Sequence, residues 1–108
     1  MFIAMNRFSI APGREAEFEE GWRRRESRLE RFHGFVQFAL LKGDTEGEYV
    51  SHTTWRSRAD FEAWANSEAF KTAHARGLPH GVMQAHPQVS LYEAVLVEGG
   101  PAVSGSGK

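Results

Sequence analysis

The chain has 108 residues, of which 13 are basic and 14 acidic, and it contains no cysteine. This length predicts one domain, and the near-neutral charge gives no general attraction to nucleic acid or to an anionic membrane. Without cysteine there is no disulfide, thiolate nucleophile or cysteine-ligated metal, and the cytoplasm is the expected location. The sequence shows neither a signal-peptide pattern nor an apolar run of about 20 residues, so we expect no membrane span.

The first element is a strand over residues 2–10, which a Pro-Gly pair then ends. One side of its period-two pattern carries four apolar residues, Phe2, Ala4, Phe8 and Ile10. Asn6 lies on that same side and interrupts it. An unpaired buried amide costs roughly 1–3 kcal/mol, so Asn6 requires either a local backbone partner or a ligand.

The next stretch, from Arg14 to about Arg31, predicts one amphipathic helix. Its apolar arc holds four residues, Phe18, Trp22, Leu29 and Phe32. Arg25 lies in the middle of this arc, where an aliphatic residue is expected. It is either a side chain that snorkels from the edge of the stripe or part of a site.

Two further strands over residues 35–42 and 48–55 predict a hairpin. The first of them is apolar on both faces, as for a strand covered on two sides. Simple alternation places Phe35 and Leu41 on one face, opposite Phe38 and Leu40.

Ser57, with Asp60 three residues later, resembles a capping box that opens a second helix. We expect a break near Asn66-Ser67, where Ser67 can cap another helical segment that ends near Gly77.

Residues 77–87 predict a loop, and a last strand follows over 88–97. The Gly/Ser-rich residues 99–108 are expected to form a disordered tail, so the domain spans residues 1–98.

The order β-α-β-β-α-β predicts a ferredoxin-like α+β fold, an antiparallel sheet with helices on one face. Such helices leave one face of the sheet uncovered, although the strands are apolar on both. We therefore expect two chains to pair as a dimeric α+β barrel, a homodimer that removes this surface from water.

Asn6, Trp64 and His74 are the candidates for chemistry. In one unbroken helix Trp64 and His74 would lie ~15 Å apart along the axis and ~80° apart around it. The predicted break can turn both toward one pocket between helix and sheet. Singly, Trp64 is explained as core and His74 as a surface cation at a helix end. Together, a histidine able to ligate iron, an amide facing it and an arginine able to pair a carboxylate fit a heme pocket.

These residues resemble the IsdG-type heme-degrading monooxygenases, within the antibiotic-biosynthesis-monooxygenase-like dimeric α+β barrels. The resemblance covers residues 1–98. Its motifs are Asn6, GFVQFALLKG at 34–43, T-x-W at 53–55 and FEAWANSEAFKTAH at 61–74. The last segment is the most specific, because its Trp64 and His74 match the family's pair in type and separation.

The resemblance implies cleavage of the porphyrin ring of heme by O2, with release of iron, heme being both substrate and oxygen-activating centre. His74 would be the axial ligand of the heme iron, and Asn6 would donate its amide N–H to the oxygen that attacks the ring. Trp64 would press on the macrocycle, Trp22 would line the pocket, and Arg25 would contact a propionate or a polar edge of the pocket. Electrons would come from an external donor, ascorbate or a reductase, because the chain carries no flavin or dinucleotide motif.

Three other interpretations stay open. The same superfamily includes cofactor-independent monooxygenases that oxidise polycyclic phenols, which need no axial histidine, and other dimeric α+β barrels bind heme or a small ligand without turnover. A non-heme metal site from His74, His80 and His86 is disfavoured, because six-residue spacings match no compact zinc motif. His33 and His52 receive no role.

Overall fold

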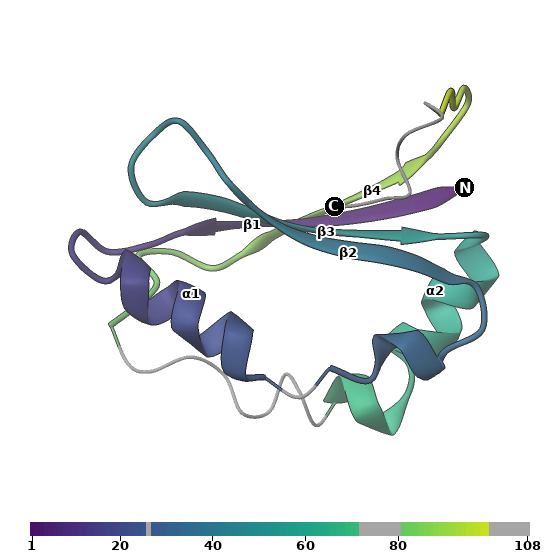
Figure 1. Ribbon diagram of the computed structural model, residues 1–108, viewed down its shortest axis with the longest axis horizontal. Helices are drawn as coiled ribbons and strands as arrows, with labels where there is room; N and C mark the ends of the chain where they lie inside the picture. Colours follow the sequence, from purple (N-terminus) through teal and green to yellow (C-terminus); the bar gives the residue numbers. More distant parts are fainter. Residues whose placement is uncertain (26, 72–80, 100–108) are drawn as a thin grey trace.

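The computed structural model describes residues 1–25, 27–71 and 81–99, which form an antiparallel sheet with helices on one face (Figure 1). The elements in chain order are β1 (Phe2–Ser9), α1 (Glu15–Arg24), the 3-10 turn η1 (Leu29–Arg31), β2 (Phe35–Lys42), β3 (Glu48–Trp55), α2 (Arg58–Ala65) and β4 (Gln88–Glu93). Residues 68–71 are again helical. No helix among the described residues is long and apolar enough to cross a membrane.

The four strands lie in the order β2-β3-β1-β4, and every neighbouring pair is antiparallel. β1 lies between β3 and β4, and its residues from Phe2 to Arg7 have a register partner in each of them. The hairpin of β2 and β3, the α+β class and the ferredoxin-like arrangement are confirmed.

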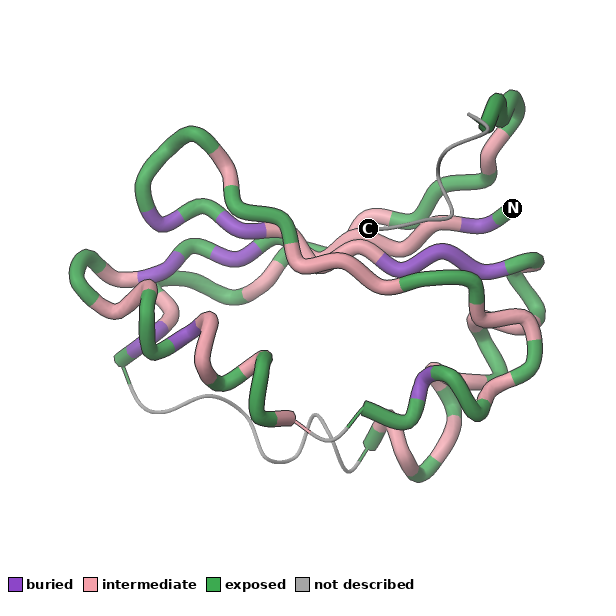
Figure 2. Tube along the Cα trace, viewed as in Figure 1, coloured by how far each residue is buried: buried purple, intermediate pink, exposed green. Residues whose placement is uncertain are grey.

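Two hydrophobic clusters pack between the sheet and the helices. The α1 cluster consists of Phe8, Ile10, Phe18, Tyr49 and Val82, with Trp22, Leu40 and Met83 against it. The α2 cluster consists of Phe2, Leu29 and Trp55, with Phe32, Phe35, Phe38, Phe61 and Trp64 against it. Figure 2 shows buried stretches of the sheet at either end and intermediate burial between them. Phe8 and Phe2 are six residues apart on β1, about 20 Å along a strand.

The single helix predicted from Arg14 to Arg31 is wrong. α1 ends at Arg24, Arg25 takes an extended conformation with φ −65° and ψ 145°, and Leu29–Arg31 form only a 3-10 turn. α1 slopes away from the sheet along its length (Figure 1), so a straight continuation would carry Leu29 away from the α2 cluster in which it is buried. The chain leaves the helix to reach that second cluster.

The break in the second helical segment is confirmed. Ser57 caps α2, since its Oγ accepts a hydrogen bond from the Asp60 N–H at 3.1 Å. After Ala65, the Ser67 hydroxyl donates to the Trp64 carbonyl at 2.6 Å and accepts from the Phe70 N–H at 3.2 Å. One side chain therefore ends one helix and begins the next.

Two strand ends differ from the expectation. β1 stops at Ser9, with Ile10 in an isolated bridge to Met83, and β4 stops at Glu93 rather than at residue 97. The predicted end of the second helical segment near Gly77 and the predicted tail beyond Gly99 lie outside the described residues.

A β-bulge in β2 overturns the predicted faces of that strand. The register with β3 shifts between Phe35 and Gln37. As a result Phe35 and Phe38 lie on the same face as Leu40, and of the four large apolar residues only Leu41 lies on the opposite face. The extra residue of a bulge reverses the alternation beyond it. The prediction that Phe35 and Leu41 share a face is therefore wrong.

The outer face, meaning the side of the sheet opposite the helices, is not covered by any described element (Figure 1). Strand alternation and register place five large apolar or aromatic side chains on it, Ile3, Met5, Leu41, Val50 and Tyr92. Leu41 and Tyr92 are 45% and 47% exposed. This surface fits the expectation of a second chain, which the single chain leaves untested.

Candidate functional site

Small side chains occupy the helix face of the sheet between the two clusters. Asn6 on β1 is the register partner of Ser51 on β3, and Ala4 is the partner of Thr53. Register partners in an antiparallel pair share a face. These four residues, which we call the floor, therefore lie side by side beneath the helices. Aromatic side chains pack against both clusters, among them Trp22 at the α1 cluster and Phe38 and Trp64 at the α2 cluster.

Asn6 carries the one side-chain atom of the floor that is buried without a hydrogen-bond partner. Its Oδ1 is buried and has no hydrogen-bond partner. The local backbone partner considered from the sequence is therefore absent among the described residues. Since an unpaired buried acceptor costs roughly 1–3 kcal/mol, this amide is arranged for something other than the stability of the ligand-free fold.

Arg25 points its guanidinium at two aromatic rings. Its Cζ lies 4.9 Å from the centroid of Trp22 and 4.5 Å from that of Phe38. The two rings are themselves stacked, with centroids 5.4 Å apart and planes 23° apart. Phe38 is the register partner of Thr53, so the guanidinium lies beside the floor. Arg25 follows the last residue of α1 and has an extended backbone, so its side chain is not bound to the direction of the helix and can turn toward the sheet.

The charge of Arg25 is not neutralised within the described part of the chain. Its Nε is buried without a hydrogen-bond partner, and no described carboxylate forms an ion pair with it. Burial lowers the pKa of this guanidinium, although arginine stays protonated near neutral pH. A half-buried cation held on two aromatic faces is a ready partner for a carboxylate.

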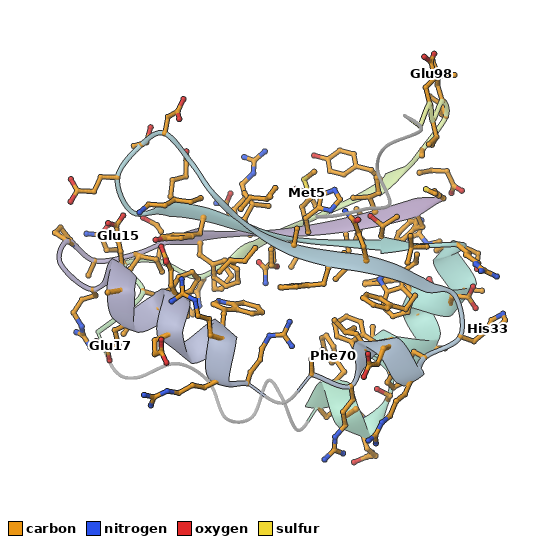
Figure 3. The ribbon with its side chains drawn as sticks, viewed as in Figure 1. Met5, Glu15, Glu17, His33, Phe70 and Glu98 are labelled. Carbon is orange, nitrogen blue, oxygen red and sulfur yellow. The ribbon has the colours of Figure 1, made fainter. Side chains whose placement is uncertain are left out.

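Trp64 lies in the α2 cluster, at the other end of the floor from Trp22. Its ring packs against Trp55, with centroids 5.6 Å apart, and edge-on against Phe70 at 4.7 Å. Phe70 lies beneath the sheet, between α1 and α2 in the view of Figure 3. These bulky aromatic neighbours hold the Trp64 ring in place. The side chain is nevertheless only half-buried. It is both core and a candidate wall of the site.

His74 and His80 lie outside the described residues, so the structure does not place the proposed axial ligand. His86 and His33 are exposed, and His52 lies on the outer face, away from the floor. Within residues 1–25, 27–71 and 81–99, no group of three His, Asp or Glu side chains could hold a metal ion.

A cavity of about 390 Å³ lies beside the edge strand β2 and shares Trp22 and Phe38 with the aromatic wall next to the floor. Its lining consists of Glu19, Trp22, Arg23, Phe38, Leu40, Lys42 and Tyr49. The buried Tyr49 donates its hydroxyl to Glu19, which lowers the pKa of that carboxyl, and Lys42 Nζ lies 3.7 Å from Glu19. We place the site at the floor instead, since Asn6 lies there, whereas the polar groups of this cavity already pair with one another.

The sequence did not single out Ser51, Phe38, Thr53 or Ala4 as parts of the site. Counting back by twos from Trp55 would have placed Thr53 and Ser51 on the core face. Nothing in the sequence states which residue of β3 lies opposite Asn6, because that register joins segments 45 positions apart.

Similarity to known proteins extends over most of the chain. The family described as "Antibiotic biosynthesis monooxygenase" matches residues 1–76. The chain is 33% identical over 82 residues to a heme oxygenase (staphylobilin-producing) of Staphylococcus haemolyticus (strain JCSC1435), a stretch covering 68% of this chain and 73% of that protein.

Two solved structures share the fold. The heme-degrader MhuD from Mycobacterium tuberculosis, with two hemes bound in its active site, has a TM-score of 0.74 at 30% identity, covering 92% of this chain and 100% of that chain. SnoaB from Streptomyces nogalater, a cofactor-independent oxygenase, has a TM-score of 0.69 at 27% identity, covering 89% of this chain and 94% of that chain.

Proposed function

The chain belongs to the antibiotic biosynthesis monooxygenase family, and on this basis we propose that it is a heme-degrading monooxygenase. Two relatives, the staphylococcal heme oxygenase and MhuD, support heme as the ligand of the floor. The observation that carries the proposal is Arg25, a half-buried cation without a described anionic partner beside an aromatic-walled floor. Heme is flat and apolar with two carboxylates, and it matches both features.

Bound heme would supply the iron that activates O2 with electrons from an external donor, and its own ring would be the substrate that is opened with release of iron. Asn6, at the centre of the floor, would donate its amide N–H to the oxygen that attacks the ring. Arg25 would hold a propionate at the edge, and Trp22 would form the wall beside it. Trp64, fixed by Trp55 and Phe70, would press on the macrocycle from the α2 cluster.

His74 is the proposed axial ligand on sequence grounds alone. It stands ten residues after Trp64, within the stretch that the family matches. A neutral imidazole with one free nitrogen is the common proximal ligand of heme iron.

The direct test is a visible spectrum of purified protein titrated with hemin and then given ascorbate under air. We expect a Soret band that decays with release of iron in the wild type, and no decay in His74→Ala. A stable bound spectrum in the wild type would contradict turnover and favour a carrier. Absence of binding would direct the search to polycyclic phenols, the kind of substrate that a cofactor-independent oxygenase of this fold could take.

Arg25 has its own test with a matched control. Arg25→Ala should weaken hemin binding by about tenfold, because a charge-assisted hydrogen bond is worth roughly 1.5–3 kcal/mol. Arg24→Ala is the control, since Arg24 is exposed at the end of the same helix and pairs with Glu20 at 2.8 Å. If both variants bind hemin like the wild type while remaining folded, Arg25 is only a snorkelling side chain.

The working unit that we propose is a cytoplasmic homodimer joined through the outer face. The apolar side chains of that face support the pairing, and the absence of cysteine fits a reducing compartment.

A further inference from the structure

We propose that Ser51 is a positioning residue for Asn6. The Ser51 hydroxyl donates to the Asn6 Oδ1 and so turns the N–H groups of the amide toward the ligand. The inference starts from the orphaned Oδ1 and from the register that sets Ser51 directly opposite it. It rests on the proposed function only for the identity of the ligand.

Among the residues of the sheet that neighbour Asn6 on the same face, Ser51 is the available donor. Along β1 they are Ala4 and Phe8, and across on β4 they are Val89 and Leu91, none of which has a polar side chain. Two more hydroxyls flank Ser51 on β3. Thr53 donates its own to the Ala4 carbonyl at 3.4 Å, and Tyr49 donates to Glu19.

The Ser51 hydroxyl has no hydrogen bond to any described residue. Register partners have Cβ atoms about 4.5–5.5 Å apart, so a rotation about the Cα–Cβ bond of Ser51 brings its Oγ within reach of the Asn6 amide. A serine hydroxyl rotates to suit its acceptor and has one proton to donate.

Orientation matters because the two ends of an amide have opposite character. With Oδ1 occupied by Ser51, the NH2 group is left to point from the floor toward the ligand, where it can stabilise negative charge that develops on oxygen. Without the hydroxyl, the amide can turn over and present its own oxygen, which repels such charge. Ser51 would thus act through Asn6 and would not itself touch the reacting atoms.

The first readout is steady-state hemin degradation by Ser51→Ala and Ser51→Thr. We expect Ser51→Ala to lower kcat by roughly tenfold with KM changed less than about twofold, as for partners that orient a functional group. Ser51→Thr should restore kcat, because threonine keeps the hydroxyl. In an Asn6→Ala background, Ser51→Ala should have no further effect. Ser90→Ala is the matched control, a serine of the same sheet on the outer face.

The second readout needs no ligand. In 15N-labelled protein, Ser51→Ala should shift the side-chain amide signals of Asn6, and Ser90→Ala should leave them in place. Unchanged Asn6 signals with unchanged kcat in Ser51→Ala would overturn the proposal, as would a loss of kcat that persists in the Asn6→Ala background. A wild type that does not degrade hemin would overturn the proposed function alone, since the amide signals would still decide the role of Ser51.

Discussion

At the scale of single residues, two polar groups on and beside the floor have no partner in the ligand-free fold. Asn6 has a buried acceptor without a partner, and Arg25 has a half-buried charge without a described counter-ion. Both residues interrupt apolar stripes that would otherwise be continuous. Unfavourable groups of this kind are expected at functional sites, where stability is lower than the fold could reach.

Asn6→Val should stabilise the protein while strongly lowering turnover. Valine suits a central strand and replaces a buried amide with an apolar side chain, so urea denaturation should show a free energy of unfolding higher by about 1 kcal/mol. Thr53→Val is the control, because Thr53 is buried beside Asn6 but its hydroxyl already donates to Ala4. Its stability should not rise. A destabilised Asn6→Val would show that hydrogen bonds to the amide stabilise the fold by more than the apolar replacement does.

The hydrogen-bonded pair of Tyr49 and Glu19, in the cavity beside β2, predicts how stability depends on pH. The hydrogen bond from Tyr49 lowers the pKa of Glu19, and burial raises the pKa of Tyr49 above its ordinary value of 10.0. Stability linked to Glu19 is thus present above its unfolded pKa and lost as the pH falls through the lowered one. Stability linked to Tyr49 is full below about pH 10 and lost above it.

Tyr49→Phe should remove both dependences. Chemical denaturation between pH 3 and pH 11 should show a lower unfolding free energy at neutral pH, with flatter acid and alkaline limbs. Unaltered limbs in the variant would mean that other groups cause the pH dependence.

At the scale of elements, the hairpin turn is fastened to the end of β1. The Ile10 N–H donates to the Gly47 carbonyl at 2.7 Å, and the Gly47 N–H donates to the Glu15 carboxylate. Gly47 has φ +83°, and a Cβ there would lie 2.6 Å from the Ile10 carbonyl oxygen. The turn can approach β1 this closely only with glycine.

Gly47→Ala should cost more stability than Gly13→Ala. Gly13 also has a positive φ, +82°, but a Cβ there meets nothing within 4 Å. The left-handed conformation alone costs about 1–2 kcal/mol in either variant, and the overlap with Ile10 adds to it only at Gly47. Thermal or urea unfolding of both variants measures the difference. Equal losses would mean that the turn moves away from β1 without penalty.

At the scale of the whole molecule, the helices cover one face of the sheet and leave the outer face open. Met5 lies near the middle of that face on the central strand. A buried dimer interface excludes unpaired charge, whereas an exposed segment tolerates it.

Met5→Asp should therefore convert a dimer into a monomer, with the mass of one chain by light scattering. Val95→Asp is the control, since Val95 follows β4 and is 96% exposed, and its mass should equal that of the wild type. A wild type with the mass of one chain would contradict the proposed homodimer.

Local chemistry along the sequence was sufficient to predict several elements. The strands, the hairpin, the Ser57 cap and the break at Ser67 depend on residues within a few positions of one another, so the pattern itself determines them. Asn6 stood out because it breaks a period of two, and Trp22 and Arg25 because they share a helical arc. Trp64 and His74 stood out because the predicted helix break can turn both toward one pocket, and the family resemblance assigned their roles.

Only the tertiary structure decided where α1 ends, which face Phe35 takes, and that Ser51 lies opposite Asn6. Each depends on segments distant in the chain: the second cluster that buries Leu29, the bulge that aligns β2 with β3, and the register between β1 and β3. Local pattern cannot supply these, because the energy that selects them comes from packing between elements and not from preferences within one element.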